Sequence, residues 1–133
     1  MTNVERLRDL LSRAVEEPDR YFEALAPDVV WDLRDTSSPE AGIYQGREAV
    51  RDFYRRWSRS FSDWNFEIDE LIDAGDSVVA FVTERGHGLG SGAEVQMKRA
   101  NVTTFRDGVV VRFRSFSDRD EALRYAGLDP RAA

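Results

Sequence analysis

Apolar residues recur at every third or fourth position in the first part of the chain, which is the spacing of an amphipathic helix. This spacing predicts a helix over 3–17 and, from Pro18, a short second helix that ends before Pro27. A long helix is predicted over 47–61. Its apolar face consists of Val50, Phe53, Tyr54, Trp57 and Phe61. Each of these helices therefore has one apolar side to bury.

The rest of the chain alternates between apolar and polar residues, which is the period of a β-strand. Strands are predicted over 29–34, 64–73, 77–87, 93–105 and 109–117. The stretch 35–46 is rich in Thr, Ser, Pro and Gly and is predicted to be a loop. Asp118, with Glu121 three residues further on, predicts a capped last helix that ends at Gly127.

The order of these elements predicts the fold class. Consecutive strands joined by short turns form a mainly antiparallel sheet, and the early helices cover one face of it. We therefore predict an α+β fold in a single domain over 1–133. A curved sheet wrapped by a long helix leaves a hollow between them, and hollows of this kind bind small molecules.

The composition of the chain excludes several classes of ligand and catalytic group. A net charge of -6 argues against binding to nucleic acid. The chain has no cysteine and one histidine, His87, which excludes disulfides, thiolate nucleophiles and zinc sites with several histidines. It has no phosphate-binding loop and no GxSxG motif. We therefore expect neither a metal nor a cofactor.

The location and source of the protein can also be predicted. No apolar run approaches the about 20 residues of a membrane span, and the polar N-terminus does not read as a secretory signal. We therefore expect no membrane partner and a cytoplasmic protein. Almost all of its basic residues are arginine, a bias typical of GC-rich bacterial genomes.

Several motifs occur together, in order, along the chain. They are Leu25-Ala26-Pro27-Asp28-Val29-Val30-Trp31, Tyr44-Gln45-Gly46-Arg47-Glu48-Ala49-Val50, Phe53-Tyr54, the glycine loop 88–92 and the ending 106–123. Over 3–128 the chain thus resembles the SnoaL-like proteins of the nuclear transport factor 2-like superfamily. The resemblance implies a cone-shaped curved sheet wrapped by helices, and a homodimer formed through the outer sheet face.

The register of these relatives implies which side chains line the hollow. Those expected are Trp31, Leu33, Tyr54, Trp57, Phe61, Phe81, Thr83, Met97, Arg99, Thr103, Phe113 and Ser115. Arg85, His87 and Asn101 fall on the same inward faces. Because side chains alternate along a strand, a slip of one residue would invert any of these assignments.

Catalytic positions of two kinds of relative can be compared with this chain. Ketosteroid isomerases use a carboxylate base on the first strand. The resemblance sets Leu33 at that position, with Asp32 beside it on the opposite face, and Asn101 at the position of a protonated aspartate. Limonene epoxide hydrolases use an Arg-x-Asp pair and a second aspartate. Of these groups Arg85 is retained, and Ser115 stands at the second aspartate.

Two functions remain open. One is a cofactor-independent acid–base enzyme of the cyclase, isomerase or hydratase type, which acts on a small apolar carbonyl or polyketide-like compound. In it His87 or Asp32 is the base, and Arg85 with Asn101 stabilises the oxyanion. The other is a non-catalytic ligand-binding or protein-interaction module on the same fold. The missing carboxylates favour this second function. A partner surface would then include Lys98, Val102, Val110 and Arg112 on the outer sheet face.

Overall fold

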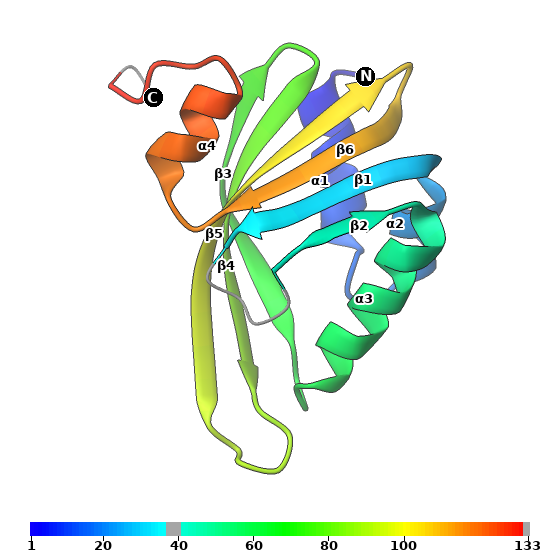
Figure 1. The fold of residues 1–133 in the computed structure, drawn as a ribbon, viewed down its shortest axis with the longest axis vertical. Helices are drawn as coiled ribbons and strands as arrows, with labels where there is room; N and C mark the ends of the chain where they lie inside the picture. The colour runs from blue at the N-terminus through cyan, green and yellow to red at the C-terminus, as the bar shows by residue number, and fades with distance from the viewer. Residues whose placement is uncertain (37–40, 132–133) are drawn as a thin grey trace.

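The computed structural model describes residues 1–36 and 41–131 of the chain. Helices and strands follow one another in the predicted order, with one additional strand, β2 (Figure 1). The elements are α1 (Asn3–Ser12), α2 (Pro18–Glu23), β1 (Leu25–Asp35), β2 (Ile43–Gln45), α3 (Arg47–Arg59), β3 (Asn65–Ala74), β4 (Ser77–His87), β5 (Glu94–Arg106), β6 (Val109–Phe116) and α4 (Arg119–Tyr125).

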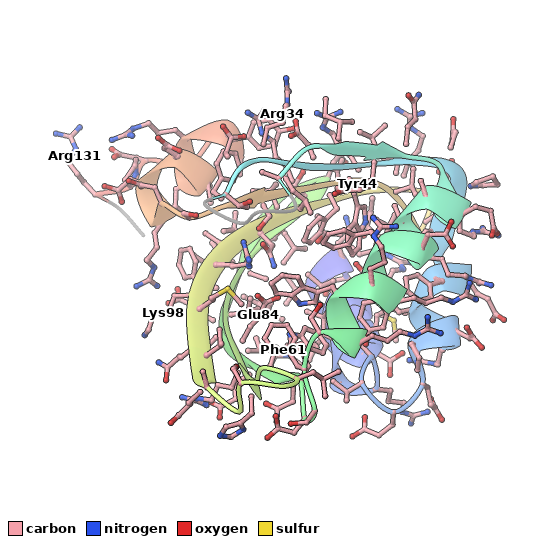
Figure 2. All side chains as sticks on the ribbon, turned by 60° about the horizontal axis from the view of Figure 1, so that its bottom comes forward. Arg34, Tyr44, Phe61, Glu84, Lys98 and Arg131 are labelled. Carbon is pink, nitrogen blue, oxygen red and sulfur yellow. The ribbon has the colours of Figure 1, made fainter. Side chains whose placement is uncertain are left out.

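Within the described residues the strands form one sheet in the order β2-β1-β6-β5-β4-β3. Neighbouring strands run antiparallel, except that β1 and β6 are parallel although they are far apart in the sequence. The sheet curves strongly around the helices (Figure 2). The predicted α+β class, with a curved and mainly antiparallel sheet, is confirmed.

Strand β2 lies in the stretch 35–46, which was predicted to be a loop. It pairs with β1, and Tyr44 lies opposite Trp31. Three residues are too few for alternation to be recognised in a sequence, which explains why this strand was missed. The centre of the predicted loop, 37–40, lies outside the described residues.

The helices cover both faces of the sheet. α1, α2 and α3 lie on its concave side, and α4 lies on the opposite side (Figure 1). The core beneath α4 contains Val79, Phe81, Ala100, Val102, Phe116, Ala122 and Leu123. Val102, which was expected on a partner surface, is therefore buried within the chain, as is Val110.

Local sequence signals account for the elements that position the site. Asp118 caps α4, since its side chain accepts a hydrogen bond from the backbone N–H of Glu121 at 3.1 Å. Asp107 and Gly108 both have positive φ, 52° and 79°, as a type I′ hairpin turn requires. This turn begins the pairing of β5 with β6, which after one irregularity at Thr104 places Asn101 opposite Ser115.

Candidate functional site

A cavity lies between the concave face of the sheet and helices α1, α2 and α3. The space that the centre of a water molecule can reach in it is about 120 Å³. An apolar cavity of about this size holds a benzene-sized molecule. Its wall consists of Leu11, Ala14, Pro18, Tyr21, Phe22, Trp31, Leu33, Phe53, Tyr54, Trp57, Trp64, Phe66, Ala80, Val82, Glu84, Arg99, Asn101, Thr103, Phe113 and Ser115.

Aromatic rings form much of this wall. Trp31 of β1 stacks on Phe113 of β6 with 4.5 Å between the ring centroids. On α3, Phe53 and Trp57 lie nearly parallel at 6.3 Å. All 3 tryptophans of the chain contribute to the wall. A planar apolar molecule in the cavity would therefore contact ring faces, and tryptophan fluorescence would report its binding.

The charged and amide groups of the wall come from three neighbouring strands. Arg99, Asn101 and Thr103 share one face because they alternate along β5. Ser115 of β6 lies opposite Asn101. Glu84 of β4 adds the carboxylate, and it points to the concave side of the sheet (Figure 2). Together these side chains make a polar strip across a largely apolar cavity.

Glu84 and Arg99 form an ion pair inside the cavity. The Arg99 Nε donates to Glu84 Oε2 at 2.7 Å, and the two side chains are 12% and 15% exposed for Arg99 and Glu84, respectively. The guanidinium also lies over the Trp57 ring, 5.8 Å from its centroid. Its Nη2 approaches the Met97 sulfur at 3.5 Å, which is a weak contact. The pair is thus largely removed from water and held on one side by an aromatic ring.

Asn101 is oriented by its neighbour Ser115. The Ser115 hydroxyl, which is almost fully buried, donates to Asn101 Oδ1 at 2.7 Å. This bond orients the amide, and among the described residues its Nδ2 has no hydrogen-bond partner, so it can donate to a ligand.

Two tyrosines, Tyr21 and Tyr54, also belong to the wall. Burial raises the pKa of both side chains above the ordinary value for tyrosine. They therefore remain neutral phenols at pH 7, with a hydroxyl that can donate or accept.

Many predicted site residues lie on this wall, including one of the four proposed catalytic residues, Asn101. The predicted residues found there are Trp31, Leu33, Tyr54, Trp57, Arg99, Asn101, Thr103, Phe113 and Ser115. Two further predictions, Phe61 and Met97, do not lie on it. The Phe61 ring packs against Gly86 where the end of α3 meets β4, and Met97 lies beside Arg99.

The register predicted for β4 is wrong by one residue. The residues expected to face inward, but found off the wall, are Phe81, Thr83, Arg85 and His87, and Ala80, Val82 and Glu84 take their place. The physical reason is strand pairing: partners directly opposite each other share a face, and Ala80 lies opposite Asn101. Both faces of β4 are apolar over residues 78–82, so alternation alone could not choose between them there.

Asp32, proposed as a base, lies on the opposite face of the sheet from the cavity and is fully buried. Its carboxylate accepts hydrogen bonds from the Arg34 side chain at 2.9 and 3.1 Å and from Arg112 at 3.3 Å. Arg114 is 3.8 Å away. The hydrogen bonds from Arg34 are the main reason that the pKa of Asp32 is below its usual value. Asp32 is therefore part of an ionic network outside the cavity.

Arg85 and His87 are also engaged away from the cavity. Arg85 pairs with Glu67 of β3. His87 Nδ1 lies 2.8 Å from Asp63 Oδ2, and both side chains are about half exposed. The hydrogen bond that His87 donates to the Asp63 carboxylate raises the pKa of His87 above its ordinary value. Neither residue lines the cavity.

Glu84 is a charged residue of the cavity wall that was not predicted from the sequence. Its place on the wall follows from the pairing of β4 with β5, which sets Ala80 opposite Asn101; Glu84, four residues further along β4, lies on the same face as Ala80. The one signal for it in the sequence is an acidic residue, Glu84, on β4 together with a basic residue, Arg99, on β5. These two side chains form an ion pair when β4 and β5 pair in the observed register.

The described part of the chain holds no cluster of three or more side chains suited to a metal ion. In residues 1–36 and 41–131, no helix has the length and apolar character needed to cross a membrane.

Solved structures with the same fold cover nearly the whole chain. An NTF2-like protein of unknown function from Burkholderia pseudomallei is 29% identical, with a TM-score of 0.75, and the match covers 93% of this chain and 97% of that one. An NTF2-like protein from Burkholderia thailandensis is 25% identical, with a TM-score of 0.77 and coverage of 96% and 98%. These two likenesses agree with the observed architecture.

A third solved structure, called a putative SnoaL-like polyketide cyclase from Jannaschia, has a TM-score of 0.70 at 19% identity, and the match covers 87% of this chain and 88% of that one. No curated protein matches the chain. The family model described as the SnoaL-like domain matches residues 4–113. The resemblance inferred from the motifs is thereby confirmed: the chain is a member of the SnoaL-like domain family and has the nuclear transport factor 2-like fold.

Proposed function

We propose that this protein binds a small, mostly apolar carbonyl compound in its cavity and acts on it as a cofactor-independent acid–base enzyme. The observation that carries the proposal is the Glu84–Arg99 pair, which brings a carboxylate and a guanidinium to the same largely aromatic space. Glu84 takes the role of general base that the sequence analysis gave to His87 or Asp32. Arg99 takes the role of Arg85.

The chemistry requires a base near a carbon–hydrogen bond and donors near the carbonyl oxygen. Glu84 removes a proton from the carbon next to the carbonyl. The C–H electron pair then forms a C=C bond, and the carbonyl π electrons move to oxygen. In a β,γ-unsaturated carbonyl compound, Glu84 returns the proton to the γ carbon and so moves the C=C bond. In a dicarbonyl compound, the enolate carbon attacks the second carbonyl carbon and closes a ring, and the alkoxide that forms takes the proton back from Glu84. No step transfers electrons to or from a cofactor.

The oxyanion donors are Arg99 and Asn101. Arg99 keeps its Nε on Glu84. Among residues 1–36 and 41–131 its terminal nitrogens have only the weak contact with Met97, so they can donate to a ligand oxygen. Asn101 offers its Nδ2 because Ser115 holds its oxygen. Donors fixed in a site with little water stabilise a developing oxyanion better than water does.

The aromatic wall supports a planar ligand, and the size of the cavity supports a small one. A structural relative of the same fold is called a SnoaL-like polyketide cyclase, and polyketide-like carbonyl compounds are accordingly included in the proposed substrate class.

Deuterium exchange tests the proposal without knowledge of the natural substrate. Acetophenone is a benzene-sized ketone whose methyl protons exchange in D2O through the enolate, and proton NMR follows their loss. We expect the wild-type protein to accelerate this exchange above the rate in buffer. Glu84→Gln should reduce the acceleration about 100-fold or more, because it removes the base.

Glu67→Gln is the matched control. Glu67 also pairs with an arginine on the next strand, Arg85, but outside the cavity, so its loss should leave the exchange rate unchanged. Equal effects of the two substitutions would contradict a catalytic role for Glu84.

A second candidate is a non-catalytic ligand-binding module. It is favoured by the engagement of the Glu84 carboxylate with Arg99 and by the position of Asp32 and His87 away from the cavity. Acetophenone that binds the wild-type protein, but exchanges no faster than in buffer, would support this module and contradict the enzyme. Failure of neutral aromatic ketones to bind at all would contradict both.

A further inference from the structure

We propose that Glu84 makes the cavity select neutral carbonyl ligands and reject carboxylates, because it neutralises the guanidinium that an anionic ligand would need. This inference rests on the proposed function, since it concerns the ligand of the same cavity. It assigns Glu84 a role in specificity that is separate from proton transfer.

The first support is the charge balance of the wall. Among the described residues that line the cavity, Arg99 is the one cation and Glu84 the one anion. The Arg99 Nε lies 2.7 Å from Glu84 Oε2, and both side chains are largely buried. The cavity therefore presents no net charge to a ligand. A ligand carboxylate would add a second negative charge beside Glu84, where little water screens the repulsion.

The second support is the set of donors that the pair leaves available. Glu84 uses the Nε of Arg99, and Nη2 has only the 3.5 Å contact with the Met97 sulfur. Nη1 has no hydrogen-bond partner within residues 1–36 and 41–131. A neutral carbonyl oxygen can accept from these terminal nitrogens without displacing Glu84. A carboxylate gains its full attraction to Arg99 only if Glu84 moves away.

Benzamide and benzoate test the selection directly. They have the same planar shape and nearly the same size, but benzoate is an anion at pH 7 because carboxylic acids titrate near pH ~4. All 3 tryptophans line the cavity, so their fluorescence follows binding, and calorimetry gives the dissociation constants independently. We expect the wild-type protein to bind benzamide at least about tenfold more tightly than benzoate.

Glu84→Gln removes the negative charge but keeps a side chain of similar size. We expect this substitution to improve benzoate binding at least about tenfold and to change benzamide binding much less. Glu67→Gln makes the same chemical change in a Glu–Arg pair outside the cavity and should leave both affinities at their wild-type values. Glu84→Asp keeps the charge and should still reject benzoate.

The outcomes separate this inference from the proposed function. Equal binding of benzamide and benzoate to the wild-type protein contradicts the charge selection alone, and this comparison needs no variant to fold. An unchanged ratio of the two affinities in folded Glu84→Gln also contradicts it. If neither benzamide nor acetophenone binds the wild-type protein, the proposed function fails, and this inference fails with it.

Discussion

The two faces of the sheet carry the same kinds of charged group in opposite settings. On the outer face, Asp32 accepts hydrogen bonds from Arg34 and Arg112, and Asp35 pairs with Arg114. Those arginines are between 24% and 58% exposed. On the cavity face, a single carboxylate meets a single guanidinium among aromatic rings.

The two ion-pair groups differ in how many partners each carboxylate has and in what the pair faces. A carboxylate with several partners, such as Asp32, is fully occupied, and its arginines keep contact with water. In the part of the chain that the structure describes, Glu84 has one partner, Arg99, and both side chains line the cavity. A pKa lowered by hydrogen bonds, as at Asp32, therefore does not by itself identify a functional residue.

The largest expected effect on stability is at the centre of the outer network. Asp32→Ala should lower the free energy of unfolding by about 3 kcal/mol, because it removes a buried acceptor from several charged donors. Urea unfolding followed by circular dichroism measures this change. Asp35→Ala, at a half-buried member of the same network, should cost clearly less.

The pH dependence of this effect has a definite sign. Since the pKa of Asp32 is lowered in the folded protein, the contribution of Asp32 to stability is present above the unfolded pKa of about 4 and is lost as the pH falls through the folded pKa.

Benzamide binding by folded Asp32→Ala should match that of the wild type. A loss of binding greater than the loss of folded protein would mean that the two faces are coupled.

A smaller effect is expected on the cavity face, at Ser115. Ser115→Ala should lower stability by about 1 kcal/mol, because Asn101 loses a buried hydrogen bond. It should also weaken benzamide binding about fivefold, since the amide is no longer held with its Nδ2 free. Calorimetry gives the affinity and urea unfolding gives the stability.

Ser77→Ala provides the comparison for this prediction. The Ser77 hydroxyl also bonds a polar side chain across the β4–β5 pair, Thr104 at 2.8 Å, but neither residue lies on the cavity wall. Its loss should affect stability to a similar degree and leave benzamide binding unchanged. A matching loss of affinity in both variants would remove Ser115 from the site.

The same two faces explain how far the sequence could predict this molecule. The helices and hairpins follow from local periodicity and from turns such as Asp107-Gly108. The parallel pairing of β1 with β6 joins segments that are far apart, so no local pattern could reveal it. The order of the elements predicted the hollow, and the family resemblance supplied the inward face of β5.

The site itself was predicted only in part, for a physical reason specific to β4. Val78, Ala80 and Val82 line one face, while Val79 and Phe81 are buried beneath α4 on the other. A strand buried on both faces has no polar alternation to set its register. The prediction of which face of β4 points inward was therefore wrong. It placed Arg85 and His87 in the cavity, where the structure has Glu84.

The smallest expected effect is at the exposed pair His87–Asp63, which lies off the cavity wall. The pKa of His87 is raised by its hydrogen bond with Asp63, so its contribution is full below the unfolded value of about 6.5 and is lost as the pH rises through the folded value. The pKa of Asp63 is lowered, so the pair also loses its effect in acid, below about pH 4.

His87→Gln should therefore reduce the free energy of unfolding slightly at pH 5 and still less at pH 8, because both side chains are solvated and salt screens them. Urea unfolding at the two pH values, in low and high salt, measures the difference. A loss of stability that grows with pH would contradict the assigned ion pair. A loss of acetophenone exchange in this variant would bring His87 back into the chemistry, and it would remove the contrast between a solvated pair outside the cavity and a desolvated pair within it.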